Sequence, residues 1–177
     1  HLSLYELTFE PGTAFTKAVE RGQMTPLNEE AQAVLYEITQ EITQAAGFPA
    51  YEVSNHASAP RHRSRHNMIY WRGGDWVGIG PGAHGRVTRD GQRFATVSEK
   101  KPDAYLDALT EGRPGWVAAD ILTPLEVARE IFGMGLRSDI GIEPERVTAL
   151  SGEPISAEKL AAFQEEGWIS RPEGRIA

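Results

Sequence analysis

The stretch NEEAQAVLYEITQEITQAA, residues 28–46, decides the fold class that the sequence predicts. Asn28 is a favoured N-cap, two glutamates follow it where the helix dipole favours negative charge, and Gly47 ends the segment. The apolar residues recur at helical spacing and form one face, which consists of Ala31, Val34, Leu35, Ile38, Ile42 and Ala45. The stretch therefore predicts a long amphipathic helix.

Short strands are predicted on both sides of this helix. Residues 2–9 form an apolar and aromatic run that Pro11-Gly12 closes, and residues 50–53 form a second short run after the helix. A strand, a helix and a strand in this order are typical of a βαβ crossover with parallel strands. We therefore expect an α/β fold, with a shorter helix at residues 13–22 in the first connection.

The middle of the chain is predicted to mix loops, strands and one helix. The dipeptide Asp90-Gly91 is a strong signal for a two-residue hairpin turn. The elements that we expect are, in order, a polar loop (54–65), a strand (76–79), a hairpin (86–97), a helix (102–110) and a linker (112–115).

The character of the sequence changes at Trp116, after which three helices are predicted, at residues 123–137, 144–150 and 156–166. The first begins with Thr123 as N-cap and Pro124 at its first position. A strand should begin at residues 168–170, which gives the plan of a winged-helix-like module whose wing is incomplete. We therefore expect two domains, residues 1–115 and residues 116–177.

The composition restricts the classes of function. The net charge is −7, and residues 118–177 carry eleven acidic against six basic side chains. An acidic surface repels phosphates, so we expect no nucleic-acid partner and interpret the winged-helix-like module as a docking or scaffold domain. The chain has no cysteine, which excludes disulfides and thiolate ligands among these residues and fits a cytoplasmic setting.

Residues 80–85, GPGAHG, match the G-x-G-x-x-G pattern of dinucleotide-binding loops. That pattern needs a helix after the loop, whose N-terminus binds the pyrophosphate, and here a hairpin is predicted instead. We therefore do not expect a dinucleotide. Two alternatives remain: a tight exit from a strand, and a loop whose backbone closely approaches a ligand.

A positive stretch lies at residues 57–72, which hold four arginines, two histidines and no acidic residue. The simplest interpretation is a solvated loop. Arginines can also bind carboxylates or phosphates, while Tyr70 and Trp71 offer flat apolar surface to a planar ligand. The same combination would suit single-stranded nucleic acid.

Two histidines, His66 and His84, are candidate ligands for haem iron, because neutral imidazole is a common iron ligand. Asn67 could orient the neighbouring ring, and His66 could equally be a structural residue. Zinc is not expected, since no set of four ligands at a recognisable spacing is present. Further candidates at predicted strand ends are Glu6, Glu10 and Glu52.

Five motifs together resemble, in order, the C-terminal half of the oxygen-independent coproporphyrinogen III oxidase-like radical SAM family. They are SLYELTFEPGT (3–13), AGFPAYEVSNHA (46–57), SRHNMIYW (64–71), GIGPGAHG (78–85) and FGMGLR (132–137). The similarity is closest to the haem chaperone (HemW) branch, because true coproporphyrinogen dehydrogenases differ at YEVSNHA and HNMIYW. The chain also starts inside a predicted strand and without Met, so we expect a fragment.

The resemblance implies an incomplete TIM-like barrel, followed by a small helical domain. It also implies S-adenosylmethionine and a [4Fe-4S] cluster held by three cysteines, which are absent from these residues. The H-N-x-x-Y-W motif of the chaperone branch is associated with haem binding and corresponds to His66, Asn67, Tyr70 and Trp71, with His66 as the ligand of the haem iron. Thr8 and His84 align with positions near bound S-adenosylmethionine.

Two functions follow from the resemblance. The first is a haem-binding chaperone that hands haem to client proteins, membrane-associated clients among them. The alternative is a radical SAM enzyme that oxidatively decarboxylates coproporphyrinogen III to protoporphyrinogen IX. The resemblance favours haem handling and leaves enzymatic turnover open. An unpaired edge on the strand at residues 2–9 would additionally favour self-association.

Overall fold

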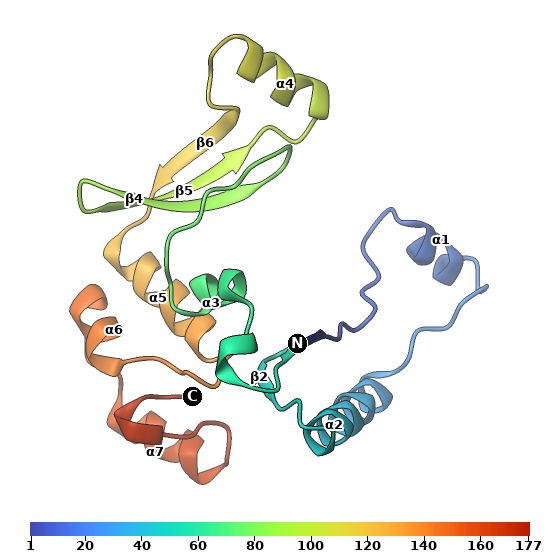
Figure 1. Ribbon diagram of the computed structural model, residues 1–177, viewed down its shortest axis with the longest axis vertical. Helices are drawn as coiled ribbons and strands as arrows, with labels where there is room; N and C mark the ends of the chain where they lie inside the picture. Colours follow the sequence, from blue (N-terminus) through green and yellow to red (C-terminus); the bar gives the residue numbers. More distant parts are fainter. The chain divides into compact units, whose positions relative to one another are not determined.

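In the computed structural model, which describes residues 1–177, the chain divides into two units, His1–Arg63 and Ser64–Ala177. Together they contain seven α-helices and two three-stranded sheets (Figure 1). The expected mixture of helices and strands is therefore confirmed. No helix has both the length and the apolar composition that a membrane crossing requires.

The helices of the first unit match their predictions. Helix α1 spans Ala14–Glu20, and helix α2 spans Glu29–Ala45. The Asn28 side chain caps α2 by accepting a hydrogen bond of 2.8 Å from the backbone N–H of Ala31. Local signals determine these helices, because the caps satisfy backbone groups that have no partner inside the helix.

The sheet of the first unit differs from its prediction. It is antiparallel, with the order β1-β3-β2, and consists of β1 (Leu2–Ser3), β2 (Ala50–Glu52) and β3 (Asn55–His56). The predicted parallel pairing is wrong, because the chain reverses after β2 and inserts β3 between the other two strands. The predicted strand at residues 2–9 is also too long, since only Leu2–Ser3 pairs.

The predicted polar loop at residues 54–65 is likewise corrected. It contains β3 and a short 3₁₀ helix, Pro60–His62. Asn55 and His56 are buried in it, because both pair with neighbouring strands inside the sheet.

The second unit contains an antiparallel sheet with the order β4-β5-β6. Strands β4 (His84–Arg89) and β5 (Gln92–Ser98) form the predicted hairpin. Asp90 and Gly91 both have positive φ, 52° and 76°, as a type I′ turn requires. Strand β6 (Trp116–Ile121) completes the sheet.

The strand predicted at residues 76–79 is reduced to a single bridge between Trp76 and Arg86. The glycines that follow explain the difference, since Gly80 and Gly82 have φ values of 104° and 69° that turn the chain away from the sheet. The dinucleotide pattern is indeed followed by β4 and not by a helix.

Five helices belong to the second unit, and four of them were predicted: α4 (Pro102–Thr110), α5 (Pro124–Gly135), α6 (Pro144–Ser151) and α7 (Ala157–Glu165). The fifth, α3 (Arg65–Trp71), was not predicted and contains the C-terminal part of the positive stretch, with Arg65 and His66. Its N-cap is Ser64, whose Oγ accepts a hydrogen bond of 3.2 Å from the backbone N–H of Asn67.

The core of the second unit joins α5, α6 and α7 to the end of the chain. Its buried residues are Ala128, Ile131, Ile142, Val147, Leu160 and Ile176. The strand predicted at residues 168–170 is not regular: Ser170 and Ala177 exchange two backbone hydrogen bonds of 2.6 and 3.0 Å, and a short 3₁₀ helix, Pro172–Gly174, lies between them. The predicted boundary after residue 115 stays a prediction, and β6 begins there by pairing with β5.

Candidate functional site

Helix α3 carries all four residues of the H-N-x-x-Y-W motif. His66 and Tyr70 are four residues apart, as are Asn67 and Trp71, so each pair is stacked along the helix. Successive residues are rotated by about 100° around the axis, so the two pairs occupy neighbouring rows. The motif therefore presents an imidazole and a phenol together, and an amide and an indole beside them.

His66, Tyr70 and Trp76 form a continuous aromatic row. The ring centroids of His66 and Tyr70 are 4.7 Å apart, and those of Tyr70 and Trp76 are also 4.7 Å apart, both pairs in edge-to-face geometry. The Tyr70 hydroxyl and Nε2 of His66 share a hydrogen bond of 2.5 Å. His66 is exposed at the open end of the row, which leaves its ring accessible to a ligand.

Two arginines of the hairpin cover the other end of this row. The guanidinium carbons of Arg86 and Arg93 lie 5.6 and 5.9 Å from the centroid of the Trp76 ring, within cation–π range. Arg86 Nε is 2.7 Å from a carboxylate oxygen of Glu130, and Arg93 Nη1 is 2.9 Å from one of Asp75. These two cations are thus neutralised by carboxylates and hold the row in place.

The carbonyl group of His84, and not its imidazole, joins this site. Its backbone oxygen accepts a hydrogen bond of 3.1 Å from Nε1 of Trp76, while the residue itself is exposed at the start of β4. Gly78 permits this approach, because a Cβ there would lie 2.5 Å from the same oxygen. The glycine-rich segment therefore serves as a tight strand exit that supports the aromatic row.

Asn67 helps to cap the N-terminal end of α3. Its backbone N–H donates to Ser64 Oγ, and the Ser64 hydroxyl donates to Oδ1 of Asn67 at 3.1 Å. These bonds resemble a capping box, in which the N-cap and the third helical residue satisfy each other. Asn67 thus fixes the start of α3 one residue after His66.

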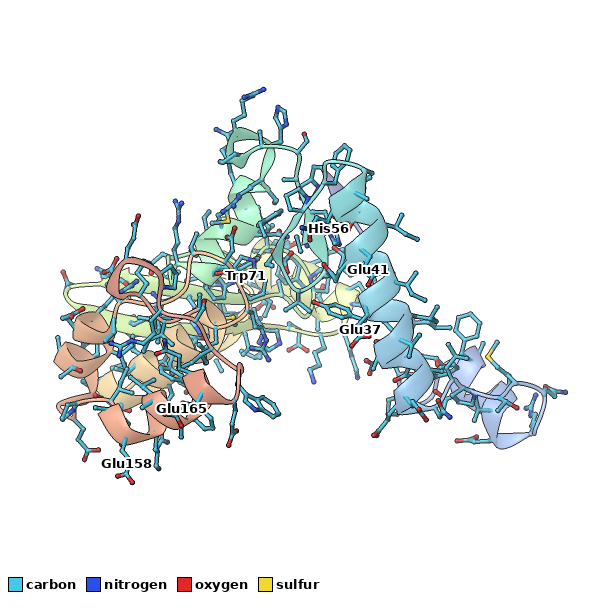
Figure 2. The ribbon with its side chains drawn as sticks, turned by 90° about the horizontal axis from the view of Figure 1, so that it is seen from below. Glu37, Glu41, His56, Trp71, Glu158 and Glu165 are labelled. Atoms are coloured by element: carbon cyan, nitrogen blue, oxygen red, sulfur yellow. The ribbon has the colours of Figure 1, made fainter.

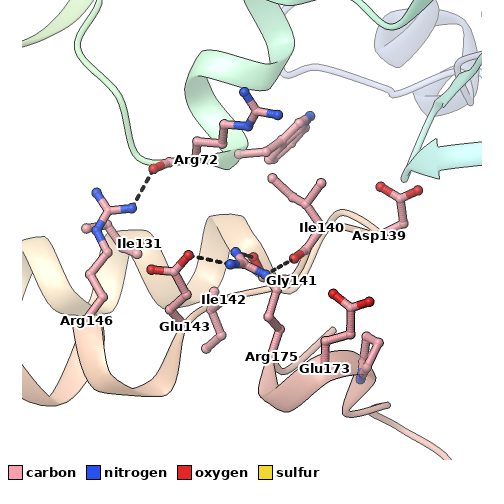
Figure 3. A pocket seen from close by; sticks show the side chains of 12 residues that line it. Arg72, Ile131, Asp139, Ile140, Gly141, Ile142, Glu143, Arg146, Glu173 and Arg175 are labelled. Carbon is pink, nitrogen blue, oxygen red and sulfur yellow. Dashed lines mark hydrogen bonds and ion pairs between the residues drawn. The ribbon is translucent and has the colours of Figure 1, made fainter. Parts of the chain in front are cut away.

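Trp71 lines a separate pocket of about 530 Å³. Figure 3 shows this pocket, with Arg72, Ile131 and Ile142 among the labelled residues of its wall. Arg146 closes one wall by donating a hydrogen bond of 2.8 Å to the carbonyl oxygen of Arg72. Arg175 forms an ion pair with Glu143 and donates to the carbonyl of Gly141 at 2.9 Å. The motif therefore divides between this pocket and the aromatic row.

The arginines of the positive stretch differ in their surroundings. Arg65 and Arg72 of α3 are exposed, and neither side chain makes a hydrogen bond or ion pair. In the first unit, Arg61 Nε donates to His62 at 3.1 Å, and Arg63 lies 5.3 Å from the Tyr51 ring centroid. Arg65 is thus the unpaired cation beside His66 in sequence.

The remaining predicted residues lie in the first unit. Thr8, Glu6 and Glu10 are exposed on the segment after β1. Glu52 is buried, and its carboxylate accepts hydrogen bonds from the backbone N–H of Ser54 at 3.2 Å and from the amide of Asn55. No group of three or more His, Cys, Asp or Glu side chains that could hold a metal ion is present.

Sequence reasoning missed the residues that complete the row, Trp76, Arg86 and Glu130. They come from a loop, a strand and α5, and only the tertiary fold joins them to α3. No local pattern could have identified them. Had α3 been recognised, the spacing of His66 and Tyr70 would have predicted their contact.

The chain is similar to two groups of proteins, which carry different names. It is 37% identical over 157 residues to radical S-adenosyl methionine domain-containing protein 1, mitochondrial, of Danio rerio, over 86% of this chain and 35% of that protein. It is 31% identical over 180 residues to the heme chaperone HemW of Bacillus subtilis, over 99% and 46% of the two chains. The HemW of Mycobacterium tuberculosis is 45% identical over 109 residues, 62% of this chain and 27% of that one.

This chain thus spans less than half of the length of these relatives. The resemblance that the motifs indicated is confirmed, because some relatives are named as radical S-adenosyl methionine domain-containing proteins and others as heme chaperones, and the chain belongs to this family. No family model matches the chain, and no solved structure does.

Proposed function

Because this chain is a relative of the radical SAM and heme chaperone proteins, we propose that it binds haem and hands it to client proteins. One observation carries the proposal: an exposed imidazole, His66, ends a packed aromatic row on α3. Such a row places an iron ligand beside aromatic rings, against which a porphyrin ring can pack.

His66 is the proposed ligand of the haem iron. When bound, haem would supply an iron that an imidazole or a phenolate can ligate, and His66 would hold it. Nε2 of His66 shares its hydrogen bond with Tyr70, so ligation through Nε2 requires this bond to open. Tyr70 would then be free to contact the ring, or to act as the ligand itself.

Charge around the row fits a ligand with carboxylates. Arg86 and Arg93 are already paired with Glu130 and Asp75, so they hold the site and do not bind the propionates. Arg65 follows the N-cap of α3 and has no partner. A guanidinium pairs well with a carboxylate, so we assign the propionate contact to Arg65.

The proposal does not include the iron–sulfur cluster that the radical SAM name implies. A [4Fe-4S] cluster needs cysteine thiolates, and these 177 residues contain none, so the chain does not fit that group. We derive no radical step and no decarboxylation here. The proximity of Thr8 and His84 to S-adenosylmethionine, a TIM-like barrel, a winged-helix-like domain at residues 116–177 and a cytoplasmic setting remain predictions.

A haemin titration tests the proposed ligand. Replacing His66→Ala should remove the Soret component that depends on this imidazole and weaken binding at α3 at least tenfold, a loss of about 1.4 kcal/mol. The matched control is His84→Ala, since His84 is also exposed but contributes only its backbone to the site. Far-UV circular dichroism verifies that each variant is folded.

Tyr70→Phe separates the two possible ligands. If His66 is the ligand, this variant retains the imidazole complex and binds at least as tightly, because the competing hydrogen bond is gone. If Tyr70 is the ligand, its loss removes the complex. Equal spectra and equal affinities for the parent and His66→Ala would refute the proposal.

A further inference from the structure

Strand β6 is an edge strand of the sheet in the second unit (Figure 1). It pairs with β5, and the backbone N–H of Leu122, next after the strand, donates to the carbonyl of Arg93 at 2.8 Å. In an antiparallel pair, alternate residues direct both backbone groups toward the partner strand, and the residues between them direct both groups away. Ala119 and Ile121 therefore point their N–H and C=O groups outward, where no other group of the chain binds them.

The side chains of β6 are apolar and exposed. Trp116, Val117 and Ile121 are 37%, 60% and 55% exposed, and Asp120 is the one charged residue of the strand. Folded proteins protect such edges with lysines, prolines or bulges, because unpaired backbone groups recruit further strands. The one irregularity in the pairing lies at the start of β6, opposite the end of β5. The rest of the edge is open to an added strand.

An acidic pocket of about 260 Å³ lies at the start of this edge, where Trp116 and Val117 line it. Its charged residues are three carboxylates and one guanidinium, Glu99, Asp107, Glu111 and Arg113. Arg113 pairs with Glu111, whereas the Asp107 carboxylate has no partner in the chain. The pocket is thus negative beside an indole ring, and a lysine or arginine side chain would be attracted to both.

The same charges disfavour a second copy of this chain as the occupant of the edge. A copy that paired antiparallel through β6 would bring its Asp120, near the end of the strand, toward the acidic pocket at the start of the other strand. A copy that paired in parallel would place the two acidic pockets side by side. Like charges meet in both arrangements, which is costly at an interface. The occupant therefore has to bring positive charge.

We propose that the free edge of β6 binds an extended segment of another protein, which carries apolar side chains and a lysine or arginine at one end. The backbone of this segment pairs with the outward groups of Ala119 and Ile121, as in other sheets that bind peptides by adding a strand. Its cation enters the pocket beside Asp107, and its apolar side chains cover Val117 and Ile121. This inference does not depend on haem binding at α3.

A synthetic peptide, acetyl-TVTVTVK-amide, tests the proposal. It alternates as a strand does, and antiparallel pairing places its lysine at the acidic pocket. At saturation, hydrogen exchange of the Ala119 and Ile121 amides should slow by about tenfold or more, because the peptide satisfies or covers their outward groups. Two N-methylated peptides separate backbone pairing from apolar adsorption. Methylation of the alternate amides that face β6 should abolish binding, and methylation of the other set should preserve it.

Variants of the edge give a second test. Ala119→Pro removes one outward N–H and keeps the bonds to β5, since proline is tolerated where that group faces solvent. It should abolish peptide binding, while Ala119→Val, which keeps the N–H, should retain it. Circular dichroism verifies that both variants are folded. If Ala119→Pro does not fold, the N-methylated peptides decide.

Charge reversal tests the pocket. Asp107→Lys should weaken the lysine peptide by about threefold or more, and it should strengthen a peptide that ends in glutamate. Two controls change the charge equally outside the pocket. They are Asp103→Lys on the same helix and Glu158→Lys on α7, where Glu158 is exposed and points outward (Figure 2). Both controls should keep the affinities of the parent.

Three results would overturn the proposal. The first is unchanged exchange at Ala119 and Ile121 under excess peptide, and the second is equal binding of the two N-methylated peptides. The third is a doubled mass in analytical ultracentrifugation that Ala119→Pro returns to that of one chain, because a second copy would then occupy the edge. None of these results would bear on the haem site proposed on α3.

Discussion

The two glycines of α5, Gly133 and Gly135, should respond in opposite ways to alanine. A Cβ at Gly133 would meet no atom within 4 Å, so Gly133→Ala gains only helix propensity, about 1 kcal/mol. A Cβ at Gly135 would overlap the Cγ2 methyl of Ile142 and lie 3.4 Å from the carbonyl oxygen of Gly141. Ile142 is buried in the core and cannot move freely.

The expected magnitude follows from these contacts. Overpacking a core by one methyl group costs about 1–3 kcal/mol, and the propensity gain of about 1 kcal/mol offsets part of it. Gly135→Ala should therefore be about 1–3 kcal/mol less stable than Gly133→Ala. The comparison between the two variants cancels the propensity gain, because both lie in the same helix.

Urea unfolding followed by tryptophan fluorescence measures this difference. All four tryptophans lie in the second unit, at positions 71, 76, 116 and 168, so the signal reports the unit that contains α5. In an Ile142→Ala background, Gly135→Ala should no longer be costly, since the overlapping methyl is absent. Equal stability of Gly133→Ala and Gly135→Ala in the parent background would refute the packing described here.

Other predictions concern the helix cap and the hairpin. Thr123→Ala should destabilise the second unit by about 1 kcal/mol, which the urea midpoint measures. Hydrogen bonds from the Thr123 backbone N–H and hydroxyl lower the pKa of Glu126 from its ordinary value of 4.5. The carboxylate form is thus favoured in the folded state, and its contribution is present above pH 4.5 and lost as the pH falls through the lowered pKa. Glu126→Ala should therefore lower the urea midpoint at pH 7, and the difference should shrink under acid; a constant difference would contradict this. Gly91→Ala should cost about 1–2 kcal/mol, because φ at Gly91 is 76°, and an unchanged midpoint would rule out the type I′ turn.

Local signals account for the parts of the fold that the sequence predicted. The helix α2 follows from its cap and apolar period, the hairpin from Asp90-Gly91, and α5 from Thr123-Pro124. Each of these depends on residues within a few positions. These elements were predicted correctly because side chains and turn residues inside each segment satisfy or arrange its backbone groups.

Contacts between distant residues account for the parts that it did not predict. Helix α3 is only seven residues long and lacks an apolar period, so its Ser64 cap alone did not reveal it. Strand β3 is two residues long and exists through pairing with β1 and β2. His66 and Tyr70 were named as candidates, but their hydrogen bond depends on α3.

The central claim is that haem binds the aromatic row of α3, and a residue-resolved map tests it most directly. Gallium(III) protoporphyrin IX, a diamagnetic analogue of haem, would be titrated into the ¹⁵N-labelled chain while amide and imidazole resonances are recorded. The account predicts saturable shifts at His66, Tyr70 and Trp76, with the Tyr70–His66 hydrogen bond lost in the complex. Unchanged resonances at these three residues under saturating porphyrin would contradict it.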